Sequence, residues 1–246
     1  MLIAVLTDLH ANREALTACL EHAQQRQAER YAFLGDLVGY GADPGWVVDK
    51  VMGYTEHGAL AVLGNHDAAV AQAHDQMHSE ARQAIAWTRT QLNPMQLHFL
   101  QNLPLSVEAH GCMFVHASAA APAQWEYITG TLEATRSMYA TPCRLTFCGH
   151  VHIPALYNLS GIGKVSAFAP NGDSSIPLGT QRHWLIIPGS VGQPRDGNPA
   201  ACYAMFNDAT NELTYYRVPY DCETAANKIL AAGLPVSFGQ RLLVGR

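Results

Sequence analysis

The sequence predicts an α/β fold in which two layers of β-sheet are flanked by helices. In the first part of the chain, short apolar runs alternate with segments whose apolar residues recur at helical spacing, which is typical of strand–helix units. Further along, the apolar runs 201–206 and 212–218 are separated by a short polar turn and are expected to pair as antiparallel strands. No repeat or linker interrupts the sequence, so we expect a single domain over residues 1–246.

The first elements follow from local residue patterns. Residues 2–6 form an apolar run that predicts a strand, and Asn12 is a favourable N-cap for the helix expected over 13–27. Because proline is favoured at the first position of a helix, Pro44 predicts the start of the next one. The strands on either side of this second helix are expected at 31–34 and 59–63.

The remaining elements begin with a helical insertion at about 68–103, whose last helix would start at Pro94. The later segments are, in order, a hairpin over 105–115, strands at 144–148 and 184–187, and a final helix over 221–232 stopped by Gly233 and Pro235.

The composition excludes several classes of protein. The chain has 15 Lys and Arg against 20 Asp and Glu, a formal net charge of −5, so long nucleic acid is not an expected partner. No apolar run reaches the roughly 18 residues that a membrane span needs, and the N-terminus has no features of a signal peptide. None of the six cysteines forms a C-x-x-C pair, which argues against thiolate zinc sites. We therefore expect a cytoplasmic protein.

Polar residues follow five of the predicted strands. Since strand ends of an α/β fold meet along one edge of the sheet, these side chains are expected to converge. They carry only carboxylate, amide and imidazole groups, which are typical ligands of Mn, Fe or Zn. Each motif alone is common in turns and caps, but the five together favour a metal site. The residues are Asp8, His10, Asp36, Asn65, His66, Asp67, His116, His150 and His152.

These motifs resemble the calcineurin-like metallophosphoesterase family. The family pattern is Asp-x-His, Gly-Asp, Gly-Asn-His-Asp/Glu, a later His, and Gly-His-x-His, and all five blocks occur between Asp8 and His152. The segments 35–41 and 188–197 also resemble the bacterial diadenosine-tetraphosphatase-like branch. The resemblance implies a two-layered β-sandwich of the metallophosphoesterase type, with a site for two metal ions.

The resemblance also implies a role for each site residue. Asp8, His10, Asp36 and His152 would hold the first metal, and Asp36, Asn65, His116 and His150 the second, so that Asp36 bridges the two. A water or hydroxide between the ions would attack phosphorus. His66 would face the phosphate as a catalytic residue. Asp67 would hydrogen-bond to His66 and raise its pKa.

Three residues are expected to contact the substrate. Asn12 is one, although its alternative role is the helix N-cap, and Arg13 beside it is equally consistent with a solvated residue. Arg195 lies in a Gly- and Pro-rich loop of a chain with only 15 Lys and Arg together, which favours contact with a phosphate.

The substrate expected from the resemblance is a small phosphodiester, nucleotide or dinucleoside polyphosphate. A Ser/Thr-type protein phosphatase is an alternative. However, Gly39 and Tyr40 stand where that class has an Asp-Arg pair, and Asp67 replaces its Glu. A non-catalytic scaffold on the same fold is a further alternative, which the presence of every motif disfavours. The sequence predicts no oligomeric state and no single metal identity.

Overall fold

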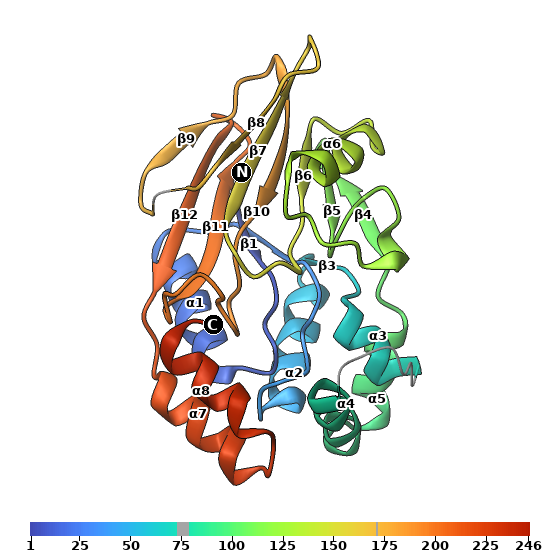
Figure 1. The fold of residues 1–246 in the computed structure, drawn as a ribbon, viewed down its shortest axis with the longest axis vertical. Coiled ribbons are helices and arrows are strands. Elements are labelled where there is room, and N and C mark those ends of the chain that lie inside the picture. The colour runs from blue at the N-terminus through green and yellow to red at the C-terminus, as the bar shows by residue number, and fades with distance from the viewer. Residues whose placement is uncertain (73–78, 171) are drawn as a thin grey trace.

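Two mixed β-sheets packed face to face form the centre of the molecule (Figure 1). The computed structural model describes residues 1–72, 79–170 and 172–246. In these ranges each sheet has six strands, and helices cover the outer sides. The predicted α/β class with two layers of sheet is therefore confirmed.

The first sheet has the strand order β3-β2-β1-β11-β12-β9. Strands β1, β2 and β3 run parallel to one another, whereas β11 pairs antiparallel with β1 and continues the sheet through β12 to β9. Its strands are Leu2–Leu6 (β1), Arg30–Phe33 (β2), Leu60–Ala61 (β3), Ser175–Pro177 (β9), Ala201–Asn207 (β11) and Glu212–Val218 (β12).

The second sheet has the order β4-β5-β6-β10-β7-β8. Its central strands β5, β6 and β10 are parallel, and antiparallel strands lie at both edges. Its strands are Ser106–Ala109 (β4), Cys112–Val115 (β5), Leu145–Phe147 (β6), Ala155–Ser160 (β7), Val165–Phe168 (β8) and Arg182–Ile187 (β10).

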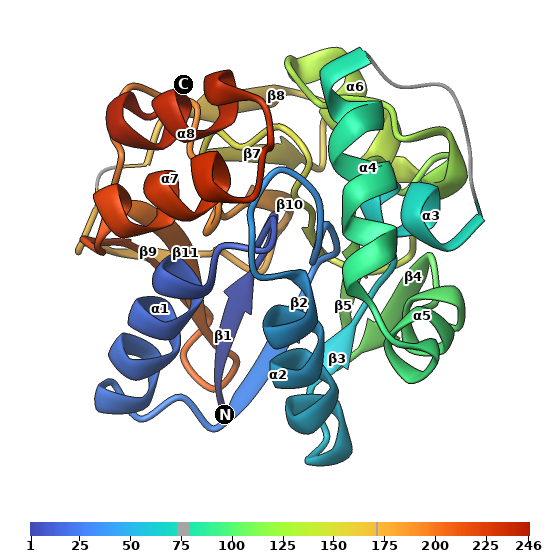
Figure 2. The ribbon, with the colours of Figure 1, turned by 90° about the horizontal axis from the view of Figure 1, so that it is seen from below.

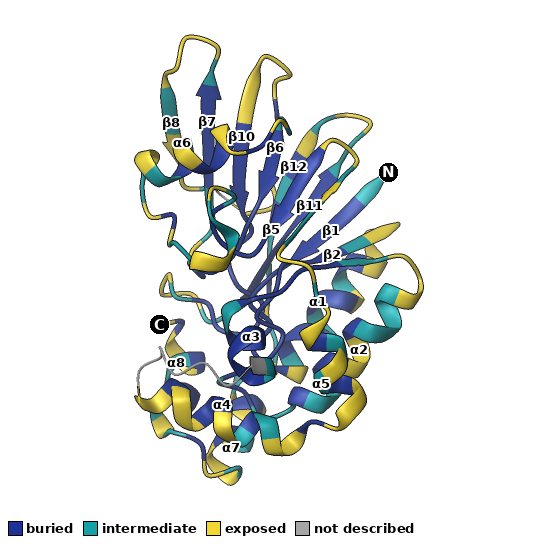
Figure 3. Cartoon of the chain, turned by 90° about the vertical axis from the view of Figure 1, so that its right-hand side faces the viewer, coloured by how far each residue is buried: buried dark blue, intermediate teal, exposed yellow. Residues whose placement is uncertain are grey.

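A continuous apolar core fills the space between the sheets. Phe147 of the second sheet packs against Phe206 of the first, with ring centroids 5.6 Å apart, and against Phe114 on the neighbouring strand. Burying aromatic side chains in this way removes a large apolar area from water and fixes the sheets against each other. Figure 3 shows the strands and the inner faces of the helices as the buried part of the chain.

Helices cover the outer faces of both sheets. Leu16 of α1 (Arg13–Gln25) and Val47 of α2 (Pro44–Glu56) pack against the first sheet, and α6 (Thr131–Tyr139) covers the second. Asn12 caps α1 by accepting a hydrogen bond from the Ala15 main-chain N–H at 3.1 Å, as its position before the helix predicts.

Two further groups of helices flank the loops that follow β1 and β2 (Figure 2). One group is α3 (Asn65–Gln72), α4 (Ser79–Gln91) and α5 (Pro94–Gln101), and the other is α7 (Cys222–Ala231) and α8 (Val236–Val244). The helical segment expected at 68–103 is thus found, except for residues 73–78, which lie outside the described residues. The groups meet where Ala84 of α4 packs with Phe238 of α8.

Among the described residues, six elements were not expected from the sequence: α6, β7, β8, β9, α8 and a short 3₁₀ helix, Pro122–Gln124. Strands β8 and β9 are short edge strands with exposed residues, so they lack an apolar run. The prediction that 221–232 is the final helix is wrong, because α8 begins directly after Pro235. Gly239 weakens the sequence signal for a helix at α8. It stands where α8 packs against Ala226 of α7. Among the described residues, none of the helices combines the length and apolar character needed to cross a lipid bilayer.

Candidate metal centre

The loops after β1, β2, β3, β5 and β6 bring the predicted site residues together. All of them are buried to at least 96 %, apart from Asn65, which is partly exposed. The close approach of the loops depends on glycine: a Cβ at Gly149 would collide with the Thr7 hydroxyl and lie 2.7 Å from the Asp8 carboxylate. This contact explains why the Gly-His-x-His block begins with glycine.

Most of the site residues have an unusual backbone conformation. Asp8, His10, Asp36, His150 and His152 have φ angles between 46° and 68°, a region that non-glycine residues rarely adopt. Hydrogen bonds between the loops hold this conformation; for example, the His10 N–H donates to the Asp36 carbonyl at 2.9 Å. Each such residue costs on the order of 1–3 kcal/mol, and strain of this kind concentrates at functional sites.

The first cluster contains Asp8, His10, Asp36 and His152, and its ligand atoms lie within 4.8 Å of one another. The Nε2 atoms of His10 and His152 are 3.1 Å apart. Nε2 of His152 is 3.4 Å from Asp8 Oδ1, and Nε2 of His10 is 3.7 Å from Asp36 Oδ2. These are the four residues that the family resemblance assigns to the first metal.

The second cluster contains Asp36, His116 and His150, with Asn65 beside it. Nε2 of His116 lies 3.4 Å from Asp36 Oδ2, 3.1 Å from Asn65 Oδ1 and 3.2 Å from His150 Nδ1. Asp36 therefore belongs to both clusters, and its carboxylate lies between them.

The hydrogen bonds of the imidazoles test whether a cation fits these clusters. In His10, His116 and His152, Nδ1 lies within hydrogen-bond distance of a main-chain carbonyl, so Nδ1 carries a proton and Nε2 is the nitrogen that faces the cluster. The carbonyls belong to Val38 (3.2 Å), Leu34 (2.7 Å) and Gln193 (2.6 Å), respectively. Imidazole nitrogens and carboxylate oxygens thus converge in both clusters, an arrangement that a cation stabilises when it takes the place of their protons.

Burial and charge set the protonation of these groups. Burial lowers the pKa of His10 and His152 well below the ordinary value, and that of His150 to about 3. His116 is the exception, because Asp36 outweighs the effect of burial and raises its pKa to about 9. Burial raises the pKa of Asp8 to about 7. The neutral imidazoles are in the form that binds metal, and a divalent cation would displace the protons from the others.

His66 lies beside the first cluster. Its ring centroid is 4.9 Å from that of His10 and 4.5 Å from that of Tyr40, and its main-chain N–H donates to Asp36 Oδ1 at 2.8 Å. Its Nδ1 is buried without a hydrogen-bond partner and faces Gly39, where a Cβ would collide with it. The neighbouring loops therefore hold His66 by packing.

The expected hydrogen bond between Asp67 and His66 is wrong. The Asp67 carboxylate instead accepts hydrogen bonds from the main-chain N–H groups of Val38 and Gly64, both at 3.1 Å. Asp67 lies in the first turn of α3, so its side chain turns back toward the preceding loops. Burial also lowers the pKa of His66, whereas the expected contact would raise it. Asp67 holds the loops together.

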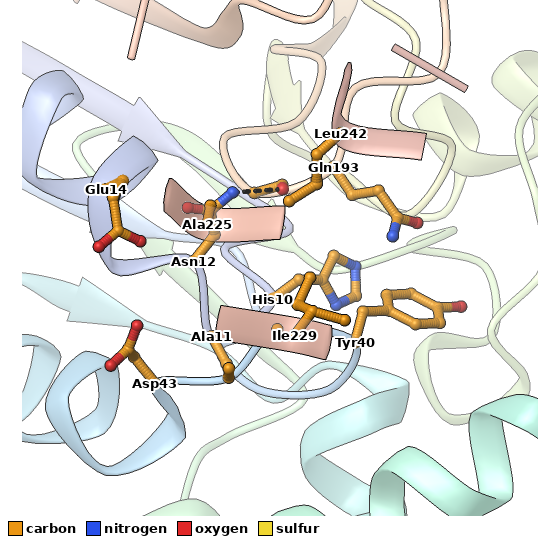
Figure 4. Close-up of a pocket in the computed structure, with 13 residues that line it drawn as sticks. His10, Ala11, Asn12, Glu14, Tyr40, Asp43, Gln193, Ala225, Ile229 and Leu242 are labelled. Atoms are coloured by element: carbon orange, nitrogen blue, oxygen red, sulfur yellow. Dashed lines mark hydrogen bonds between the residues drawn. The ribbon is translucent and has the colours of Figure 1, made fainter. Parts of the chain in front are cut away.

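Two of the three residues expected to contact the substrate make other interactions in the structure. The Asn12 amide donates to the Gly192 carbonyl at 2.9 Å (Figure 4) and to the Tyr220 hydroxyl at 3.2 Å. Together with the cap of α1, these hydrogen bonds occupy the side chain. It lines a small cavity behind His10 that α7 and α8 help to close. Arg13 is exposed, and its guanidinium lies over the Trp46 ring, 5.0 Å from the centroid.

Arg195 lies next to the clusters. Its Nη2 donates to Gln193 Oε1 at 3.0 Å, and its guanidinium is 5.7 Å from the centroid of Tyr40. Its positive charge lowers the pKa of His10 and His152, in addition to the larger effect of burial. Arg195 is therefore close enough to attract an anion held at the clusters.

Two neighbours of the clusters were missed from the sequence. Gln193 is buried and supplies the carbonyl that orients His152. Tyr127 stacks on His150 with ring centroids 3.9 Å apart and planes inclined by 25°. Gln193 lies within the segment 188–197, where the resemblance assigned it no role, and the Trp-Glu-Tyr sequence at 125–127 is the sign of an aromatic loop after His116.

Comparison with known proteins agrees with this geometry. Residues 1–211 match the model of the calcineurin-like phosphoesterase superfamily domain. The chain belongs to this family. The resemblance inferred from the five sequence blocks is thereby confirmed, and the family indicates a hydrolase.

Similar proteins span the whole chain. The uncharacterized protein MJ0912 of Methanocaldococcus jannaschii is 35% identical over 251 residues, which covers 100% of this chain and 98% of that protein. A metallophosphoesterase structure from Sphaerobacter thermophilus is 34% identical, with a TM-score of 0.89 over 100% of this chain and 99% of that one. The protein PH1004 of Pyrococcus horikoshii OT3 shares the fold at 19% identity, with a TM-score of 0.80 over 100% and 98% of the two chains.

Proposed function

We propose that this protein is a dinuclear metal-dependent phosphoesterase that hydrolyses a small phosphate ester or anhydride. The observation that carries the proposal is the sharing of Asp36 by two clusters in which imidazole nitrogens converge on carboxylate oxygens. Nitrogen and oxygen donors of this kind favour Mn, Fe or Zn. The first ion would be held by Asp8, His10, Asp36 and His152. The second would be held by Asp36, Asn65, His116 and His150.

The donor set also fits the charge of the substrate. When bound, two divalent cations supply positive charge that stabilises phosphoryl oxygens and increases the acidity of water nearby. Asp8 and Asp36 are the only anionic donors of the proposed set, since Asn65 contributes a neutral amide oxygen. The net charge of the loaded centre is therefore positive, which favours binding of a phosphate anion.

His66 is the residue that we propose acts on the leaving group. Its ring is buried beside His10, it is held by packing rather than by a carboxylate, and burial keeps it neutral when no anion is bound. A phosphate anion brought next to this ring would favour its protonated form. His66 would then donate a proton to the departing oxygen or stabilise its charge.

Arg195 is the residue that we propose binds the substrate phosphate. Its guanidinium can donate to two phosphoryl oxygens at once, and its Gln193 contact leaves most of its donors free for this purpose. Tyr40, which stands where the protein-phosphatase pattern has an arginine, packs on His10 and His66 instead. This packing argues for a small-molecule phosphoesterase over a Ser/Thr protein phosphatase.

The substrate class can be tested directly with metal-reconstituted protein. We expect turnover of bis(p-nitrophenyl) phosphate, and a comparison of p-nitrophenyl phosphate, a nucleoside monophosphate and diadenosine tetraphosphate then ranks monoester, nucleotide and dinucleoside polyphosphate substrates. The Arg195→Ala variant should raise KM for the preferred substrate more than it lowers kcat. Arg13→Ala is the matched control and should leave both unchanged. Absence of hydrolysis of all four compounds by the metal-loaded protein would contradict the proposal.

A further inference from the structure

Tyr127 covers one of the proposed metal ligands. It lies in the segment between β5 and α6, and its ring stacks on the imidazole of His150 at a centroid distance of 3.9 Å and an angle of 25°. Tyr127 is 51% exposed, so this contact is made at the surface of the centre and not within a packed core. An exposed tyrosine is thus held flat against the imidazole of a proposed metal ligand.

His150 is held differently from the other three imidazoles of the two clusters. His10, His116 and His152 anchor Nδ1 on a main-chain carbonyl and present Nε2. His150 presents Nδ1 to the second cluster, and its buried Nε2 has no well-aligned hydrogen-bond partner. The Trp125 main chain lies close to His150, and the stacked ring of Tyr127 covers its face, so both contacts restrain rotation of this ring.

We propose that Tyr127 is a positioning residue that orients His150 for the second metal ion. The proposal rests on the dinuclear centre proposed above. Groups that orient a metal-bound histidine usually change metal affinity by about 10- to 100-fold when they are removed. The other three imidazoles are anchored by a hydrogen bond at Nδ1, whereas the face of His150 is held by the stacked ring of Tyr127.

The effect should be confined to the second ion. His10, a member of the first cluster, has ring contacts with Tyr40, His66 and His152. These contacts lie on the side of the first ion, away from His150. Removal of Tyr127 leaves these contacts in place. The first ion should therefore bind with unchanged affinity when the tyrosine is lost.

The phenol hydroxyl and the ring can be separated by mutation. Stacking on His150 is made by the ring of Tyr127 and does not need its hydroxyl. Tyr127→Phe should therefore retain the affinity for both ions. Tyr127→Ala removes the stacked face, and Tyr139→Ala is a matched control because Tyr139 is a 69% exposed tyrosine on α6.

The test is a calorimetric titration of the chelator-treated full chain with Mn²⁺, with circular dichroism to verify folding. We expect two sites in the wild type, in Tyr127→Phe and in Tyr139→Ala. In Tyr127→Ala we expect one site of unchanged affinity and a second weakened by at least about 10-fold. If Tyr127→Ala does not fold, Tyr127→Leu makes the same test with a bulkier, non-aromatic side chain.

Each contrary result has a separate meaning. Two unchanged sites in folded Tyr127→Ala would overturn the inference and leave the proposed function standing. Equal weakening of both sites, or the same loss in Tyr139→Ala, would also overturn it, because the effect would not be specific to His150. Fewer than two Mn²⁺ sites in the wild type would overturn the dinuclear proposal and, with it, the role of Tyr127.

Discussion

The Nε2 atoms of His10 and His152 lie 3.1 Å apart, with the rings stacked at a centroid distance of 4.8 Å. Each ring has its Nδ1 within hydrogen-bond distance of a main-chain carbonyl, so each Nε2 directs a lone pair at the other. Two neutral imidazoles repel each other in this arrangement, and a shared cation removes the repulsion. This pair is the strongest local sign that the centre is built to hold metal.

The shared carboxylate can be tested with Asp36→Asn. The amide oxygen preserves the hydrogen bond accepted from the His66 main chain at 2.8 Å, but the amide NH₂ cannot bind a cation. We expect loss of turnover together with loss of the dinuclear site, measured by metal analysis of the desalted protein and by hydrolysis of bis(p-nitrophenyl) phosphate. A folded variant that retains two ions and normal turnover would show that Asp36 is not the bridge.

His66→Ala separates metal binding from catalysis. Because His66 is not among the residues of either cluster, the metal content should stay the same. Loss of a general acid typically lowers the rate by about 10²- to 10⁴-fold, and we expect kcat to fall by this order. Full activity of the metal-loaded variant would remove His66 from the mechanism.

The packing of His66 can be disturbed by substituting Gly39, which lies against its ring. A Cβ at Gly39 would collide with His66 Nδ1, and Gly39 has a φ of 90°. Gly58 has a similar φ of 88° but nothing within 4 Å of its Cβ position, so it serves as the control. Both changes to Ala should cost about 1–2 kcal/mol of stability from backbone strain. Only Gly39→Ala should also lower kcat, with metal content unchanged; equal kinetics in the two variants would contradict this account.

Asp67→Asn tests the corrected role of Asp67. An amide in its place directs NH₂ at one of the main-chain N–H groups of Gly64 and Val38, which leaves a buried donor unsatisfied. We expect a loss of about 1–3 kcal/mol in the free energy of unfolding of the metal-free protein, measured with urea. Unchanged stability combined with a shifted pH–rate profile would instead favour the direct contact between Asp67 and His66.

The sequence predicted the site better than its surroundings. Asp8, Asp36 and His116 follow buried strands, and the parallel strands of an α/β fold place such positions at a common edge, so their convergence was predictable. The direction of the Asp67 side chain was not, because it depends on the approach of the Gly64 and Val38 main chains from other loops.

The missed parts share a physical cause. Tyr127 reaches His150 across 23 residues of sequence through a loop with no regular pattern, and only the folded chain brings the two rings together. Likewise, α8 acquires its stability from packing of Phe238 against Tyr40 and α7, so its local propensity was not informative. Long-range packing of this kind leaves no periodic signal.

The central claim is that two cations held by these clusters are required for phosphoester hydrolysis. The most direct measurement is the rate of bis(p-nitrophenyl) phosphate hydrolysis by chelator-treated protein as Mn²⁺ is added back in counted equivalents. The account predicts that chelation abolishes hydrolysis and that activity returns as the second equivalent binds. Hydrolysis by the metal-free protein at the rate of the untreated sample would contradict it.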